Sequence, residues 1–177
     1  MRIFLLTLGI VAVFGIMVLT FVPTRVLKNA GLRGVEWLVH LSAPAQELSP
    51  EELLQRLENK PAETIIFDVR EQKEYDVSHI SGAVQVSPAI TEADFTRLYG
   101  QTLQGKTVVF YCSVGKRSSD TALRVEASAR KSGAAEVVNL RGGIFRWYNS
   151  GFPVVNAQGM AGAVHPFNAQ WGFFVAQ

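Results

Sequence analysis

The sequence is poor in cysteine and in charge. Its 177 residues include one cysteine, Cys112, so a disulfide within the chain is excluded, and a lone thiol is compatible with a reducing or an oxidising compartment. Only 18% of the residues are charged, and the formal net charge is +2. Residues 1–45 hold four basic side chains and one acidic one, which leaves residues 46–177 at −1. This balance excludes a basic nucleic-acid-binding domain.

One long uncharged run is present, at the N-terminus. The 20 residues from Ile3 to Val22 carry no charge, and at about 1.5 Å per residue they are long enough to cross a bilayer core of about 30 Å. A cleaved signal peptide is the competing interpretation, but its apolar core is usually about 7–15 residues long and small residues follow it directly. Here Arg25 comes soon after the run, and the first Ala-x-Ala is Ala43-Pro44-Ala45. We therefore predict an uncleaved transmembrane anchor over residues 1–23.

The flanking charges favour one orientation of that anchor. Arg25, Lys28 and Arg33 follow the run, whereas Arg2 and the terminal amine precede it, so the positive-inside rule favours a cytoplasmic domain. The difference between the two flanks is about one positive charge, and an anchor with a short N-terminal flank often exports the domain behind it. Either side of the membrane is therefore a possible location of the domain. We predict an amphipathic linker over residues 24–45, which lies on the membrane surface, packs against the domain or serves as a plain helical spacer.

The central part of the chain alternates between two kinds of pattern. A helix start is indicated at Ser49, which can cap it, with proline next and Glu52 three residues after the cap. Strands and helices in alternation predict an α/β fold with a parallel sheet flanked by helices. We expect strands at 64–67, 83–86, 107–111 and 136–140, and helices at 72–77, 92–99, 118–131 and 144–150.

Cys112 lies where such a fold places its ligands. It follows the β-branched and aromatic strand 107–111 and precedes a helix, and parallel sheets bind ligands at the carboxyl ends of their strands. Free backbone N–H groups and the positive end of the helix dipole would surround the sulfur, and Lys116 and Arg117 add two charges. All of these favour the thiolate over the thiol. A buried, inert cysteine is the alternative, and the Gly-Lys-Arg-Ser that comes after it argues against this.

Several separated segments resemble one family, the rhodaneses or thiosulfate sulfurtransferases, in their single-domain form. The resemblance covers about residues 46–156, which we take as a rhodanese-like domain. It depends on Cys112-Ser113-Val114-Gly115-Lys116-Arg117-Ser118, on Phe67-Asp68-Val69-Arg70, on Glu74-Tyr75 through His79-Ile80-Ser81-Gly82-Ala83, and on Asn139-Leu140-Arg141-Gly142-Gly143 with Trp147 and Gly151-Phe152-Pro153-Val154.

The resemblance implies sulfur transfer with no metal or organic cofactor. The Cys112 thiolate would take sulfur from thiosulfate or a similar donor anion and hold it as a persulfide. With no second cysteine present, the sulfur must pass to cyanide, a small thiol or a protein thiol. Related phosphatases need five residues between cysteine and arginine, whereas Arg117 follows Cys112 after four, so phosphatase or arsenate reductase chemistry is disfavoured. The predicted substrate-binding residues are Ser113, Val114, Gly115, Lys116, Arg117 and Ser118.

Three further residues are predicted to support the site without reacting. Asp68 and Arg70 end a strand and would form a buried ion pair that shapes the site. Arg141 begins a loop whose glycines allow close backbone approach to the active site, with Gly143 near the start of the last helix. His79 is expected to be a hydrogen-bonded structural histidine.

The tail over residues 157–177 is too aromatic for a disordered segment and too short for a domain. We expect it to pack back on the domain or on the membrane surface, with a partner-docking segment as the alternative. For the whole chain, the alternative to an enzyme is a membrane-tethered persulfide carrier or docking module with little activity on free thiosulfate.

Overall fold

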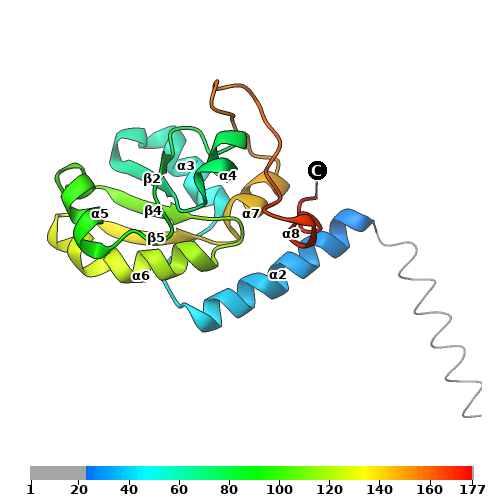
Figure 1. Cartoon of the computed structure of the whole chain (residues 1–177), viewed down its shortest axis with the longest axis horizontal. Coiled ribbons are helices and arrows are strands. Elements are labelled where there is room, and N and C mark those ends of the chain that lie inside the picture. The colour runs from blue at the N-terminus through cyan, green and yellow to red at the C-terminus, as the bar shows by residue number, and fades with distance from the viewer. Residues whose placement is uncertain (1–22, 177) are drawn as a thin grey trace, which may run out of the picture.

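The strand that precedes Cys112 lies at the centre of a single parallel sheet. In the computed structural model, which describes residues 23–176, five strands pair in the order β1-β5-β4-β2-β3 (Figure 1). Neighbouring strands are parallel in every pair. The strands are β1 (Glu47–Leu48), β2 (Thr64–Asp68), β3 (Val84–Gln85), β4 (Thr107–Tyr111) and β5 (Glu136–Leu140). The predicted α/β architecture is confirmed.

The central strand is buried on both faces, and its side chains alternate between two cores. Val109 and Tyr111 belong to one core, and Val108 and Phe110 belong to the other. Helices cover each face (Figure 1). The first core lies under α3 (Pro50–Asn59), α4 (Gln72–Val77) and α7 (Gly143–Asn149). The second core lies under α5 (Glu92–Tyr99) and α6 (Lys116–Lys131). Short 3₁₀ helices follow α3 and α5, at Pro61–Glu63 and Gly100–Thr102.

A long helix, α2 (Thr24–Ser42), packs against this domain. Its residues Leu32, Glu36 and Val39 are buried. Glu36 forms an ion pair with Arg146 of α7. Of the three arrangements that the amphipathic pattern allowed, packing against the domain is the one observed.

The C-terminal tail also packs back on the domain, which was one of its two predicted placements. It contains a short helix, α8 (Ala169–Gly172), which lies beside α2 (Figure 1). Trp171 and Phe174 are partly buried against the first core. Lys28 of α2 donates a hydrogen bond to the carbonyl oxygen of Val175, so the two segments contact each other.

Within residues 23–176, no helix combines the length and the apolar character that a bilayer crossing requires. The predicted anchor over Ile3–Val22 lies outside the described residues and stays a prediction.

Candidate active site

Cys112 follows β4 directly and heads a tight loop. Its side chain is 1% exposed, and its Sγ accepts a hydrogen bond of 3.2 Å from the backbone N–H of Gly115. Gly115 has a φ of +106°, a left-handed conformation that favours glycine, and it precedes the first residue of α6, Lys116. The loop thus turns the chain from strand to helix within four residues, 112–115, and leaves the sulfur beside the positive end of α6.

The N-terminus of α7 supports this loop from one side. The N–H of Ile144 donates to the carbonyl oxygen of Cys112 at 2.9 Å, and the N–H of Phe145 donates to that of Ser113 at 3.1 Å. The N–H and C=O of a trans peptide point in opposite directions, so the N–H groups of these two loop peptides point away from α7. Gly143 is the first residue of α7, as predicted, and it makes the close approach possible.

Arg117 lies in a network with a buried acid. Its guanidinium donates to both carboxylate oxygens of Glu74, at 3.1 and 3.2 Å, and to Ser113 Oγ at 3.1 Å. Burial acts to raise the pKa of Glu74, but the hydrogen bonds and charge of Arg117 outweigh it and hold that pKa below its usual 4.5. Burial acts to lower the pKa of Arg117, but its bonds to Glu74 and its interaction with the Cys112 sulfur outweigh burial and raise it.

Lys116, the other predicted anion holder, is also paired. Its Nζ lies 2.6 Å from both carboxylate oxygens of Asp120, one turn further along α6, and its side chain is about half exposed. Lys116 and Arg117, the first two residues of α6, are therefore each paired with an acid of the same domain.

Ser118 stabilises the loop from the protein interior. Its side chain is buried, and its hydroxyl bonds to the carbonyl oxygen of Gly115 at 3.1 Å and to Oδ1 of Asn139 at 2.7 Å. The hydroxyl that we predicted to contact substrate is thus occupied by the protein itself. Among the other predicted contacts, Ser113, Val114, Lys116 and Arg117 line a cavity with Cys112.

The supporting residues lie beside this loop or on the edge near it. Asp68 and Arg70 form the predicted ion pair, fully buried, with the guanidinium bonded to Asp68 at 2.6–3.1 Å. Arg70 also donates to the carbonyl oxygen of Ser78, so it connects β2 to the end of α4. His79 is structural, as expected, with Nδ1 3.0 Å from a carbonyl oxygen of α4. Arg141 follows β5 and is exposed, and it does not line the cavity.

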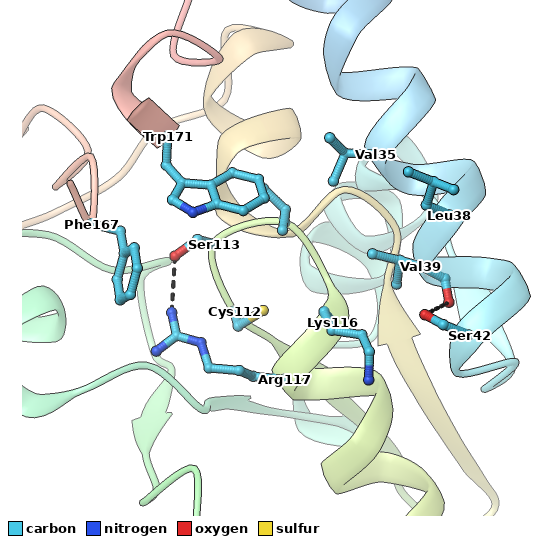
Figure 2. A pocket seen from close by; sticks show the side chains of 11 residues that line it. Val35, Leu38, Val39, Ser42, Cys112, Ser113, Lys116, Arg117, Phe167 and Trp171 are labelled. Carbon is cyan, nitrogen blue, oxygen red and sulfur yellow. Dashed lines mark hydrogen bonds between the residues drawn. The ribbon is translucent and has the colours of Figure 1, made fainter. Parts of the chain in front are cut away.

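A cavity of about 490 Å³ opens over the sulfur. Its floor is the cysteine loop. One wall comes from α2 and the other from the tail, and Figure 2 shows them on opposite sides of the loop. The walls consist of Val35, Leu38, Val39 and Ser42 on the α2 side and of Phe167 and Trp171 on the tail side.

Three contributors to this site were not predicted from the sequence. Glu74 lies within the family-like segment, but nothing in the sequence indicated that it would pair with Arg117, which is 43 residues away. Phe167 lies with its ring centroid 5.1 Å from the Arg117 guanidinium, and α2 closes the opposite side. The aromatic composition of the tail was the only sequence signal for Phe167. The apolar stripe of α2 was the only signal for the wall on the opposite side.

Comparisons with known proteins place the central part of the chain in one family. The model of the rhodanese-like domain family matches residues 49–150, more than half of the chain. A probable adenylyltransferase/sulfurtransferase MoeZ of Mycobacterium tuberculosis is 31% identical over 110 residues, 60% of this chain and 25% of the relative. A tRNA uridine(34) hydroxylase of onion yellows phytoplasma is 32% identical over 104 residues, 56% of this chain and 31% of the relative. The chain thus spans a quarter to a third of the length of these two relatives.

The fold has solved counterparts as well. The crystal structure of a thiosulfate sulfurtransferase from Pseudomonas aeruginosa superposes with a TM-score of 0.55 at 23% identity, over 79% of this chain and 26% of that chain. At this identity the likeness establishes the fold.

Proposed function

This chain belongs to the rhodanese-like family, and we propose that it is a sulfurtransferase that moves sulfane sulfur from thiosulfate or a similar donor to a thiol or cyanide. The observation that carries the proposal is the position of Cys112. It is the only cysteine of the chain, it lies at the carboxyl end of the central parallel strand, and its Sγ accepts an N–H bond at the start of α6. That environment favours a nucleophilic thiolate.

The reaction follows from that nucleophile in two displacements. The Cys112 thiolate attacks the outer sulfur of thiosulfate, the sulfur–sulfur bond breaks, and its electron pair leaves with sulfite. The acceptor thiolate then attacks the outer sulfur of the Cys112 persulfide, and the electron pair of the breaking bond returns to Sγ. The N–H of Gly115 and the charge of Arg117 would stabilise the anionic sulfur in both states.

The short loop supports sulfur rather than phosphate as the group transferred. Only four residues separate Cys112 from Arg117, and the hydroxyl of Ser118 bonds back to the loop. A loop of this length surrounds a single sulfur atom, whereas a phosphate needs a wider ring of N–H groups.

The test is the intact mass of the full chain after exposure to thiosulfate, with Cys112→Ser beside it. We expect a gain of the mass of one sulfur atom that disappears when cyanide is added and is absent in the variant. No gain in either protein would contradict thiosulfate as the donor. A gain retained in the serine variant would contradict Cys112 as the carrier.

One observation favours a second candidate, a persulfide carrier with little activity on free thiosulfate. Lys116 and Arg117 are both paired with acids, so few free charges face a small dianion. In that case transfer would be slow for the isolated protein and fast only with a partner, which steady-state assays with and without a membrane extract would distinguish.

We also propose that residues 1–23 anchor the domain at the cytoplasmic face of a membrane. The uncharged run Ile3–Val22 and the basic residues Arg25, Lys28 and Arg33 behind it support this placement.

A further inference from the structure

The cavity over Cys112 is much larger than a small inorganic anion requires. Its volume of about 490 Å³ falls in the range of about 300–1,000 Å³ that is usual for sites that bind organic ligands. Thiosulfate or cyanide at Sγ would fill only a small part of it. The remaining space is large enough for a bulkier group on one of the two reactants.

Apart from Ser42, the walls of the cavity are apolar, and they lie outside the family domain. Val35, Leu38 and Val39 come from α2, and Phe167 and Trp171 come from the tail. Both segments fall outside the matched residues 49–150. The residues of the matched domain alone would leave Cys112 at an open edge, and the segments on either side of that domain supply the apolar walls.

The two charged groups on the floor of the cavity are each paired with an acid of the domain. Lys116 Nζ lies 2.6 Å from Asp120, and Arg117 is bonded to Glu74. The ring of Phe167 lies beside the Arg117 guanidinium, with 5.1 Å between its centroid and Cζ, and adds an aromatic contact to this paired cation. Among the described residues that line the cavity, both cations therefore have protein partners.

On the basis of the proposed persulfide chemistry, we propose that the sulfur acceptor is a low-molecular-weight thiol with an apolar alkyl or aryl body. The body lies between α2 and the tail, and the thiolate points to the floor. The thiolate attacks the outer sulfur of the Cys112 persulfide, forms the organic persulfide and releases the Cys112 thiolate. No oxidant or reductant is consumed.

The first part of the test measures binding without reaction. The full chain in lipid nanodiscs is titrated with methyl 2-phenylethyl sulfide, which has an apolar body and no thiol, and the thermal unfolding midpoint is followed. Leu38→Gln is the cavity variant and Leu41→Gln is its match, because both leucines are exposed residues of α2, at 59% and 60%, and only Leu38 lines the cavity. We expect methyl 2-phenylethyl sulfide to raise the unfolding midpoint of the unmodified protein. Leu38→Gln should weaken this stabilisation, and Leu41→Gln should retain it.

The second part measures transfer. Protein loaded with thiosulfate is mixed with 2-phenylethanethiol or with 2-mercaptoethanol, at equal free aqueous concentration, and rates are corrected for the thiolate fraction. We expect the phenyl thiol to react at least about tenfold faster, and Leu38→Gln or Trp171→Ala to remove most of that preference. Equal rates for the two thiols, no stabilisation by the sulfide, or equal weakening by both leucine variants would overturn the inference.

The experiments distinguish a failure of the proposed thiosulfate reaction from a failure of the proposed acceptor class. If thiosulfate adds no sulfur but the sulfide binds in a Leu38-dependent way, the proposed thiosulfate reaction is wrong while the specificity for an apolar body stands. If sulfur is added and neither preference nor binding is seen, the reaction stands and the acceptor class is wrong.

Discussion

At the scale of single residues, the geometry of the cysteine loop depends on a glycine that does not belong to it. Gly143 has a φ of +57°, and a Cβ there would overlap the carbonyl oxygen of Cys112 and come within 2.7 Å of that of Ser113. Those two carbonyls are the ones that α7 holds by hydrogen bonds. The loop and α7 can therefore keep this contact only without a side chain at residue 143.

Gly143→Ala should lower both stability and sulfur loading. A left-handed φ costs a residue with a side chain about 1–2 kcal/mol, and displacement of the loop adds to this. Gly151→Ala is the control, because its φ is +87° but nothing lies within 4 Å of a Cβ at that position. Denaturant unfolding and the rate of sulfur gain by mass would be compared. Equal stability losses with normal loading in Gly143→Ala would contradict the packing explanation.

Glu74 gives the site a pH-dependent contribution to stability. The pKa of its carboxyl is held below 4.5 in the folded protein, so the stabilisation is present above the unfolded value and is lost as pH falls through the folded value. Glu74→Gln should therefore cost about 2 kcal/mol at neutral pH, the range for hydrogen bonds to charged groups, and progressively less as pH falls below 4.5. Unfolding free energies across that range measure it. Glu58→Gln, an exposed residue of α3, should show no such trend, and a pH-independent cost for Glu74→Gln would refute the mechanism.

The sequence predicts the proposed nucleophile better than it predicts the residues around it. Cys112 is recognisable from the local pattern, because the strand before it and the glycine and two cations after it all lie within five residues of it. The acid opposite Arg117 is 43 residues away and is brought in by tertiary packing, which no local spacing encodes. The pairing of Lys116 with Asp120 was accessible from the i, i+4 spacing on a helix, but only once the helix is known to begin at Lys116.

At the scale of elements, the boundaries that a local sequence pattern marks were predicted accurately, and the others were not. The predicted bounds of β4, β5, α4 and α5 are those observed, because clear periodicity and flanking turn residues mark them. α6 begins two residues earlier than predicted, since Gly115 adopts the left-handed conformation that lets the polar Lys116 and Arg117 enter its first turn. β1 and α8 were missed, because two and four residues are too short to show a period.

One asparagine connects three elements that the sequence shows only as separate segments. Asn149, the last residue of α7, donates to Oδ1 of Asn29 on α2 at 3.1 Å and to the carbonyl oxygen of Phe174 at 2.8 Å. Its own Oδ1 accepts from the N–H of Ala176 at 2.8 Å. This residue is buried, so its polar groups depend on these partners.

Asn149→Ala should loosen α2 and the tail together while the sheet stays intact. With three bonds lost at about 1 kcal/mol each, we expect a destabilisation of about 2–3 kcal/mol. Hydrogen exchange should rise in α2 and in residues 169–176 but not in β4. Asn59→Ala is the control, since Asn59 also ends a helix but makes one local bond to Gln55. Unchanged exchange in the tail would show that the apolar contacts alone hold it.

At the scale of the whole molecule, the family domain is enclosed by the segments on either side of it in the chain. Residues 49–150 supply the sheet and the cysteine loop, whereas α2 and the tail supply the walls above Cys112. The helix that forms one wall begins at Thr24, directly after the predicted anchor. An anchor at residues 1–23 would therefore lead directly into the helix that forms one wall of the cavity.

The membrane prediction is tested by expressing the full chain in bacteria. We expect it in the membrane fraction and resistant to extraction by alkaline carbonate, with a mass that shows no cleavage. Val13→Asp, near the middle of the uncharged run, should shift the protein toward the soluble fraction, since a charge at the centre of a spanning helix costs about 3 kcal/mol. In spheroplasts the domain should resist added protease until the cells are lysed, as the basic residues after the run imply. A shortened mature chain would instead establish a cleaved signal peptide, and digestion in intact spheroplasts would place the domain on the opposite side.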